Sequence, residues 1–304
     1  MRASVPPGLD GRRADLVVAR LAGVSRTDAR ALVESGSASF DGAALRPSDR
    51  VASGTVVDVD LPEPRPLLVP EDVVFRVRYE DGDLAVVDKP AGVVVHPGAG
   101  VHSGTLAAGL LHRWPKIEGV GDEGRWGIVH RLDRDTSGLL AVALTDRAFG
   151  PLRAAIAARR VTRAYRALVI GEPPAATGTI DAPLDRDPAR PGMVAVRPEG
   201  RPARTHYRRL AVWPEHGVSL LEVRLETGRT HQIRVHLAAV GLPVAGDPRY
   251  GAGRGPAPRL FLHAAHLGLD HPVTGERLEV DAPLPDDLAE AVRALGEPAV
   301  GGVR

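Results

Sequence analysis

The chain contains no cysteine, and this absence removes several kinds of site from consideration. Disulfides, zinc–thiolate centres, iron–sulfur clusters and thiol nucleophiles are all excluded. Long apolar runs are also absent: none reaches the length of about 18 residues that a membrane-spanning helix needs. The first residues, 1–7, lack the apolar core of a secretory signal. A cytoplasmic location is the simplest expectation.

Aromatic residues are scarce, and the net charge is small. Aromatic side chains make up 4% of the 304 residues, too few for a broad platform on which the bases of single-stranded RNA could stack. The net charge is only +1, so any attraction to nucleic acid must be local. Segment 185–209 has a local excess, with seven arginines against three carboxylates. It could follow a phosphate backbone, or it could be a solvated loop.

The first part of the chain has the pattern of a small domain. Apolar residues recur at helical spacing over 12–22, and a capping motif at Ser25–Asp28 opens a second helix. An Asp-Gly turn then precedes the alternating strand 56–61. These elements predict a domain over residues 10–62. Closely spaced prolines predict a stiff linker over residues 63–71.

The rest of the chain has a different character. Apolar runs typical of strands alternate irregularly with helical segments, and there is no βαβ repeat. We therefore expect an α+β domain over residues 72–296, with a mostly antiparallel or mixed sheet. The expected strands are 84–87, 139–144, 164–170, 206–212 and 218–225, and the expected helices are 105–112, 149–158, 230–240 and 287–295.

A short polar run before one of these strands could carry chemistry. Asp133 lies between Arg131 and Arg134, and a Thr-Ser-Gly turn leads from it into the apolar run 139–144. A carboxylate held beside arginines suits a nucleophile or a general base and does not suit a general acid. A structural ion pair that ties the loop is the alternative. On sequence spacing alone, that alternative is the more frequent outcome.

A second polar cluster, residues 228–236, opens the expected helix 230–240. His231 and Arg234 share a face at a spacing of three, and the helix N-terminus could bind phosphate. A metal site is a weaker alternative, because its two helical histidines are five positions apart and diverge by about 140°. Its ligands would be His130, Asp135, His231 and His236.

Two further residues say little by themselves. Lys89 ends an expected strand just before a Pro-Ala-Gly turn, from which its side chain could reach a phosphate. Tyr165 is one of four tyrosines in the chain, and a single tyrosine in a strand usually belongs to the core or the sheet surface.

Taken together and in order, these motifs resemble those of the pseudouridine synthases of the type that acts on ribosomal large-subunit RNA, closest to their D branch. The resemblance covers roughly residues 10–295, and the first part is similar to an S4 RNA-binding domain. It is carried by Asp88–Gly92 with His96-Pro97, by His130–Asp133 with Thr136–Leu139, by Tyr165 with Gly171, and by Gly228–His236 with Gly246-Asp247.

The resemblance implies roles for individual residues. Asp133 would be the nucleophile, Tyr165 would stack on the target base, and Arg234 would pair with Asp133. Contacts to the RNA would come from Arg131, Lys89, Arg229 and His231. The fold would be a mixed, largely antiparallel sheet with flanking helices, and neither a metal nor an organic cofactor would be needed. The expected partner is RNA, with ribosomal large-subunit RNA favoured, possibly within a ribosomal particle.

Other functions remain open at the level of sequence. Transfer RNA is an alternative substrate within the same family. A non-catalytic RNA-binding or ribosome-assembly factor is a second alternative, although the three proposed catalytic residues argue against it. A glycosidase-like hydrolase would need paired carboxylates, and Asp133 and Asp135 are only two residues apart. The S4-like part departs from its family at Ala14, where leucine is common, and at Asp41, which replaces the usual asparagine.

Overall fold

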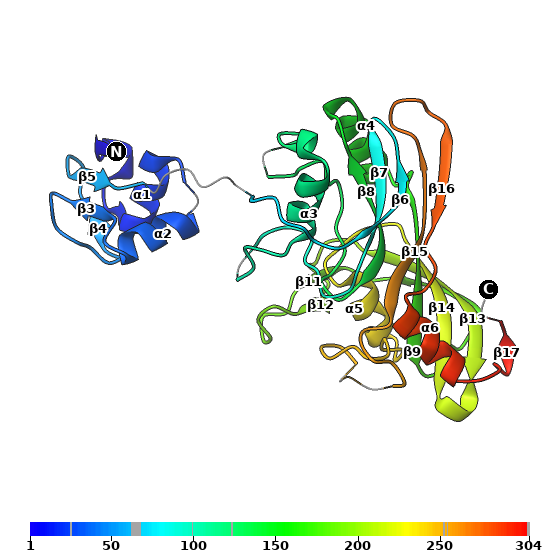
Figure 1. The fold of residues 1–304 in the computed structure, drawn as a ribbon. Coiled ribbons are helices and arrows are strands. Elements are labelled where there is room, and N and C mark those ends of the chain that lie inside the picture. Colours follow the sequence, from blue (N-terminus) through cyan, green and yellow to red (C-terminus); the bar gives the residue numbers. More distant parts are fainter. Residues whose placement is uncertain are drawn as a thin grey trace. The chain divides into compact units, whose positions relative to one another are not determined.

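The computed structural model describes residues 1–24, 26–61, 68–98, 100–122, 124–251, 253 and 255–302. It divides the chain into two compact units, residues 1–67 and 68–304 (Figure 1). Ser25 of the predicted capping motif and most of the predicted Pro-rich linker lie outside the described residues.

The first unit combines two helices with short antiparallel strands. A three-stranded sheet has the order β1-β5-β3, and β2 pairs separately with β4. The unit begins before residue 10, where the sequence placed its start, because β1 pairs with β5 from Arg2 onward. Its elements are β1 (Arg2–Ser4), η1 (Pro7–Leu9), β2 (Arg12–Arg13), α1 (Ala14–Ala22), α2 (Arg26–Glu34), β3 (Ala38–Phe40), β4 (Arg50–Val51) and β5 (Val56–Val59).

A buried carboxylate ties the two helices of this unit together. Asp15, in the first turn of α1, accepts hydrogen bonds from Arg13 at 3.1 Å and from Arg26, the first residue of α2, at 3.3 Å. The bonds from Arg13 outweigh the effect of burial and lower the pKa of Asp15. The pair of arginines explains why an aspartate can lie inside this small core.

The second unit is built on one ten-stranded sheet, with the main order β10-β13-β14-β9-β15-β8-β7-β6. Strand β16 adds to β15, and β17 adds to β13. Its strands are β6 (Arg76–Glu80), β7 (Leu84–Lys89), β8 (Ser137–Ala143), β9 (Thr162–Ile170), β10 (Thr177–Asp181), β13 (Arg204–Trp213), β14 (Val218–Leu225), β15 (Leu262–Asp270), β16 (Arg277–Asp281) and β17 (Val300–Gly301), and β11 (Leu184–Arg186) with β12 (Val194–Val196) forms a separate ribbon.

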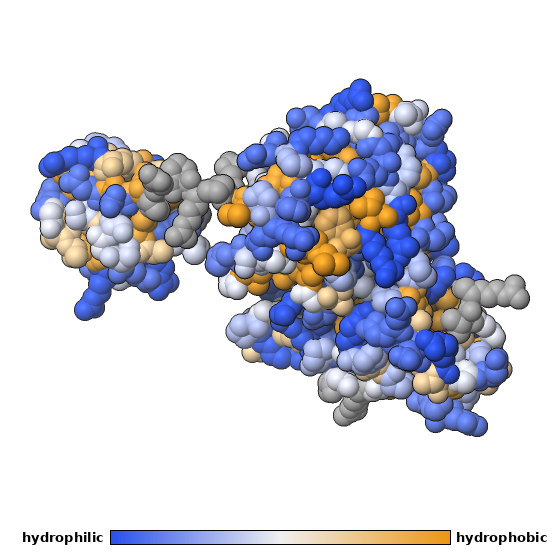
Figure 2. All heavy atoms as spheres, viewed as in Figure 1, coloured by the Kyte–Doolittle hydropathy of each residue, from blue (hydrophilic) through white to orange (hydrophobic). Residues whose placement is uncertain are grey.

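Helices flank this sheet, with α4 beside β8 and α5 beside β13 (Figure 1). The mixed, largely antiparallel sheet predicted from the sequence is confirmed, since β8 and β15 form the one parallel pair among the described strands. Figure 2 shows groups of hydrophobic residues among hydrophilic ones on the visible face of this unit. The helices are α3 (Leu106–Arg113), η2 (Pro115–Ile117), α4 (Asp146–Ala157), η3 (Pro214–His216), α5 (Gln232–Ala239) and α6 (Asp286–Ala294).

Some boundaries differ from those expected. Helix α5 begins at Gln232 and not at Thr230, because His231 has a left-handed backbone with φ of 55° that a helix cannot contain. Strands β15 and β16 were not expected at all, although β15 lies at the centre of the sheet. None of the helices in the described residues is long and apolar enough to cross a membrane.

The parallel pairing of β8 with β15 joins the two halves of the sheet at Gly138. This residue pairs with Ala264 and has φ of 114°, a conformation that side chains rarely adopt. A Cβ atom added there would lie 2.3 Å from the carbonyl oxygen of Ala264. The polar run around Asp133 enters β8 just before this contact, so the junction fixes one end of that run.

We expect Gly138→Ala to lower the free energy of unfolding by about 3 kcal/mol, because the new methyl group must displace backbone and adopt a strained φ. Gly82→Ala is the matched control: Gly82 is exposed, has no atom within 4 Å of an added Cβ, and should change stability by less than about 0.5 kcal/mol. Urea unfolding of both variants measures the difference. Equal midpoints would contradict the close approach of β8 and β15.

Candidate active site

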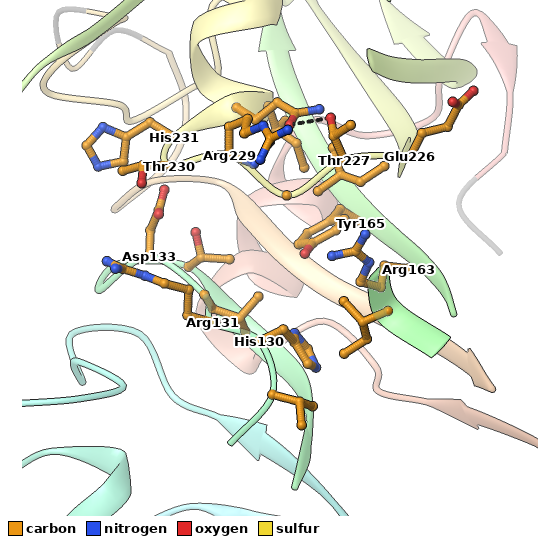
Figure 3. A pocket seen from close by; sticks show the side chains of 18 of the residues that line it. His130, Arg131, Asp133, Arg163, Tyr165, Glu226, Thr227, Arg229, Thr230 and His231 are labelled. Atoms are coloured by element: carbon orange, nitrogen blue, oxygen red, sulfur yellow. Dashed lines mark hydrogen bonds between the residues drawn. The ribbon is translucent and has the colours of Figure 1, made fainter. Parts of the chain in front are cut away.

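One pocket of about 450 Å³ lies where four parts of the second unit meet. Its walls come from the run before β8, from β9, from the end of α4, and from the segment that joins β14 to α5. Figure 3 shows Asp133 on one side of this pocket and Tyr165 with Arg163 on the other. The structure thus brings together residues more than a hundred positions apart in the sequence.

Asp133 has a basic partner inside the pocket. Its Oδ2 atom lies 3.4 Å from Nη1 of Arg234, and 18% of its side chain is exposed, so the carboxylate is held yet can be reached. Arg234 itself is buried, with 4% of its side chain exposed. The pairing implied by the family resemblance is therefore present, and it involves Arg234 and not the neighbouring Arg131 or Arg134.

Asp247 fixes the position of Arg234. Nε and Nη2 of Arg234 donate to the two carboxylate oxygens of Asp247 at 2.7 and 2.8 Å, a bidentate pair that sets the plane of the guanidinium. Asp247 is fully buried. Burial acts to raise its pKa, but the bonds and the charge of Arg234, together with backbone hydrogen bonds from Arg249 and Tyr250, outweigh burial and lower the pKa. Asp247 was quoted as part of a motif, but sequence reasoning gave it no role.

Tyr250 and His231 extend this arrangement. The ring of Tyr250 lies 5.1 Å from the guanidinium carbon of Arg234, within the range of a cation–π contact. Its hydroxyl group is hydrogen-bonded to Nδ1 of His231 at 2.9 Å. His231, half-buried, lines the pocket as expected, and burial lowers its pKa. Tyr250 carried no signal in the sequence.

Tyr165 lies on β9 and faces into the pocket (Figure 3). It is buried, and burial raises the pKa of its phenol. Arg163 lies two residues earlier on the same strand and therefore on the same face. It also lines the pocket, although sequence reasoning assigned it nothing. Its spacing from Tyr165 was the available signal.

The structure gives Lys89 a role that differs from the predicted contact with RNA. The side chain is fully buried and does not line the pocket. Its ammonium group donates to the carbonyl oxygens of Pro90 at 2.8 Å, Val93 at 2.9 Å and Arg134 at 3.0 Å. Burial lowers the pKa of Lys89 to about 7. Lys89 therefore holds the run around Asp133 from behind and cannot reach a phosphate.

The rim of the pocket is basic. Arg131 is exposed there and Arg229 is half-buried, so both remain available to a ligand. The lining includes six arginines but only two carboxylates, an excess that favours an anionic ligand such as RNA. The arginines are Arg125, Arg131, Arg159, Arg163, Arg229 and Arg234, and the carboxylates are Asp133 and Glu226.

The histidines considered for a metal site have other partners. Nε2 of His130 accepts a hydrogen bond from the backbone of Ala141 at 3.0 Å, and burial lowers the pKa of His130 to about 3. His236 is hydrogen-bonded to Thr205 and to the carbonyl of Ala182. Within the described part of the chain, no three His, Asp or Glu side chains form a group that could hold a metal ion.

We expect Lys89→Met to lower the free energy of unfolding by about 3 kcal/mol or more, because the buried ammonium group that bonds three carbonyl oxygens is removed. Turnover should fall as well, since the run around Asp133 loses its support. Lys116→Met is the control: the chain's other lysine is exposed, and among the described residues it bonds only the carbonyl of Gly82. Thermal unfolding and single-turnover kinetics of both variants test this; a Lys89→Met protein as stable as Lys116→Met would refute the bracing role.

Comparison with known proteins gives a consistent result. Residues 83–239 match the family model described as RNA pseudouridylate synthase. The chain is 50% identical, over 97% of its length and 93% of the relative's, to an uncharacterized RNA pseudouridine synthase of Chloroflexus aurantiacus. It is 43% identical to the ribosomal large subunit pseudouridine synthase D of Xanthomonas campestris, over 97% and 92%. The solved structure of human RNA pseudouridylate synthase domain containing 1 superposes with a TM-score of 0.56 at 30% identity, covering 80% of this chain and 100% of the human one.

Proposed function

Because this chain belongs to the RNA pseudouridylate synthase family and is an isomerase that acts on RNA, we propose that Asp133 is the nucleophile with which it converts uridine into pseudouridine. One observation carries this assignment. The partly exposed carboxylate of Asp133, paired with Arg234, faces Tyr165 across a pocket with room for a nucleotide base (Figure 3). A base stacked in RNA can enter only if it is flipped out of its helix or loop.

The reaction needs few groups. The N1–C1′ bond breaks with its electron pair on the base, while Asp133 either bonds to C1′ or removes a proton from the ribose. The free uracil then turns within the pocket, where we assign Tyr165 to hold its face. A new bond joins C5 to C1′ while the bond from Asp133 to C1′ breaks or, on the other route, while Asp133 returns its proton to the ribose. Loss of the C5 proton and protonation of N1 complete the product. Arg234 positions the carboxylate for the first step, and the acid–base steps need no more than one carboxylate.

We further propose ribosomal large-subunit RNA as the substrate, and the cytoplasm as the place of action. Two lines support this choice: the name of the relative in Xanthomonas campestris, and the N-terminal unit, which we assign as an S4-like RNA-binding domain. The second unit, residues 68–304, is the proposed catalytic domain. Arg131, Arg229 and His231 at the rim are the proposed contacts to the RNA backbone or flanking bases.

We expect Asp133→Asn to lower the isomerisation rate by a factor of about 1,000 or more while RNA binding persists, because an amide cannot act as a nucleophile. Asp135→Asn is the matched control, since Asp135 is a close and exposed carboxylate outside the pocket. Cells that lack the wild-type gene and carry either variant are compared by mapping pseudouridine in ribosomal and transfer RNA.

With Asp135→Asn, at least one pseudouridine in large-subunit ribosomal RNA should be restored. With Asp133→Asn it should remain absent. Restoration by both variants would overturn the role of Asp133. A lost site in transfer RNA alone would overturn the substrate and leave the role of Asp133 intact.

Removal of residues 1–67 should leave the second unit folded, because each unit has its own apolar core. Affinity for RNA should fall by about tenfold or more, since two linked binding modules gain from each other's proximity. Circular dichroism and titration with ribosomal RNA fragments measure these two effects. Unfolding of the shortened protein, or unchanged affinity, would contradict the division of roles.

A further inference from the structure

Arg163 is a buried cation for which the described residues provide no partner. Only 8% of the residue is exposed, and its Nε atom is buried with no hydrogen-bond acceptor. Its guanidinium forms no hydrogen bond or ion pair with any residue that the structure describes. Buried charges in proteins are nearly always paired, because an unpaired one costs free energy. Arg234 in the same pocket obeys this rule, with Asp247 and Asp133 as partners.

The guanidinium of Arg163 lies deep in the pocket beside Tyr165. Both side chains come from the same face of β9 and point toward the side occupied by Asp133 (Figure 3). Nη1 of Arg163 lies beneath the loop before α5, since a Cβ added at Gly228 would be 3.1 Å from it. His130 is near enough that the charge of Arg163 adds to burial in lowering its pKa to about 3, so this neighbour stays neutral.

We propose that Arg163 donates hydrogen bonds to a carbonyl oxygen of the target uracil and stabilises the negative charge that the base acquires when the N1–C1′ bond breaks. This inference rests on the proposed function. The electron pair of the broken bond goes to N1 and spreads onto the two carbonyl oxygens. A fixed cation in a site shielded from water stabilises such a charge strongly, because it does not need to reorganise during the reaction.

Other arginines of the pocket suit this task less well. Arg234 is already neutralised by two carboxylates, and Arg159 pairs with Glu226 at 3.0 Å. Arg131 and Arg125 are exposed at the rim, where phosphate groups, which keep much of their hydration, are the natural ligands. The buried Arg163 is therefore placed to bind the base, whereas the exposed arginines at the rim are placed to bind the RNA backbone.

The test is Arg163→Met, which keeps the apolar stem and removes the charge. We expect the single-turnover rate with a uridine-containing RNA fragment to fall by about 100-fold or more, with the dissociation constant of the RNA changed by less than about threefold. The melting temperature should rise, because a buried unpaired charge is removed. A residue that merely supports the fold would give the opposite shift in melting temperature.

Arg166→Met is the matched control. Arg166 lies three residues further along β9, on the opposite face, and pairs with Glu222 at 3.0 Å outside the pocket. Its replacement should leave the rate within about threefold. A rate for Arg163→Met equal to that of Arg166→Met would overturn the inference, as would a fall in both melting temperature and rate. Lack of isomerisation by the wild-type protein would instead count against the proposed function.

A second measurement identifies what Arg163 binds. With RNA that carries 5-fluorouridine at the target position, fluorine stabilises the departing anion, so the rate of consumption of this nucleoside should suffer at least about tenfold less from Arg163→Met than the rate with uridine. The salt dependence of RNA binding should stay the same. A decrease of about one in the slope of log K against log salt, with equal rate losses on both substrates, would show a phosphate contact and overturn the inference.

Discussion

The site depends on how the five N–H donors of one guanidinium are shared. Nε and Nη2 of Arg234 each donate to the fully buried Asp247, and Nη1 donates to Asp133. The direction of the bond to Asp133 is therefore set before any ligand binds. A lysine could carry the same charge but not the same geometry, because an ammonium group has no plane. The contacts of Tyr250 and His231 follow from that fixed plane.

Two further contacts restrain the run around Asp133, one at Arg134 and one where the run enters β8. Lys89 binds the carbonyl of Arg134 from the interior, and Gly138 allows β8 to press against β15 where the run ends. The carboxylate is therefore on an irregular segment that has little freedom, although segments of this kind are usually mobile. A nucleophile on such a support can be exposed to a ligand without being displaced by it.

Much of this could be predicted from the sequence, and the failures have physical causes. Apolar periodicity located the α-helices and several central strands of the sheet, but it missed β15 and many shorter strands. The family resemblance of the motifs implied that Asp133 pairs with Arg234. The role of Lys89 was missed, because a motif names a residue but not the direction of its side chain. Asp247 and Tyr250 were missed because they lie in a loop, where no periodic spacing indicates which side chains of α5 they contact. Arg163 could have been found, since alternation along β9 places it beside Tyr165.

The parallel junction between β8 and β15 also affects when the protein can fold during its synthesis on the ribosome. Ser137 and His263 meet across this junction although 126 positions separate them, and contacts of such long range are slow to form because a large loop must close first. Strands β6 to β8 can pair as soon as they are synthesised, since they follow one another. The pocket, in contrast, cannot be complete until β15 has left the ribosome. More than a hundred residues are therefore added after the reactive carboxylate before it has the surroundings that would make it active.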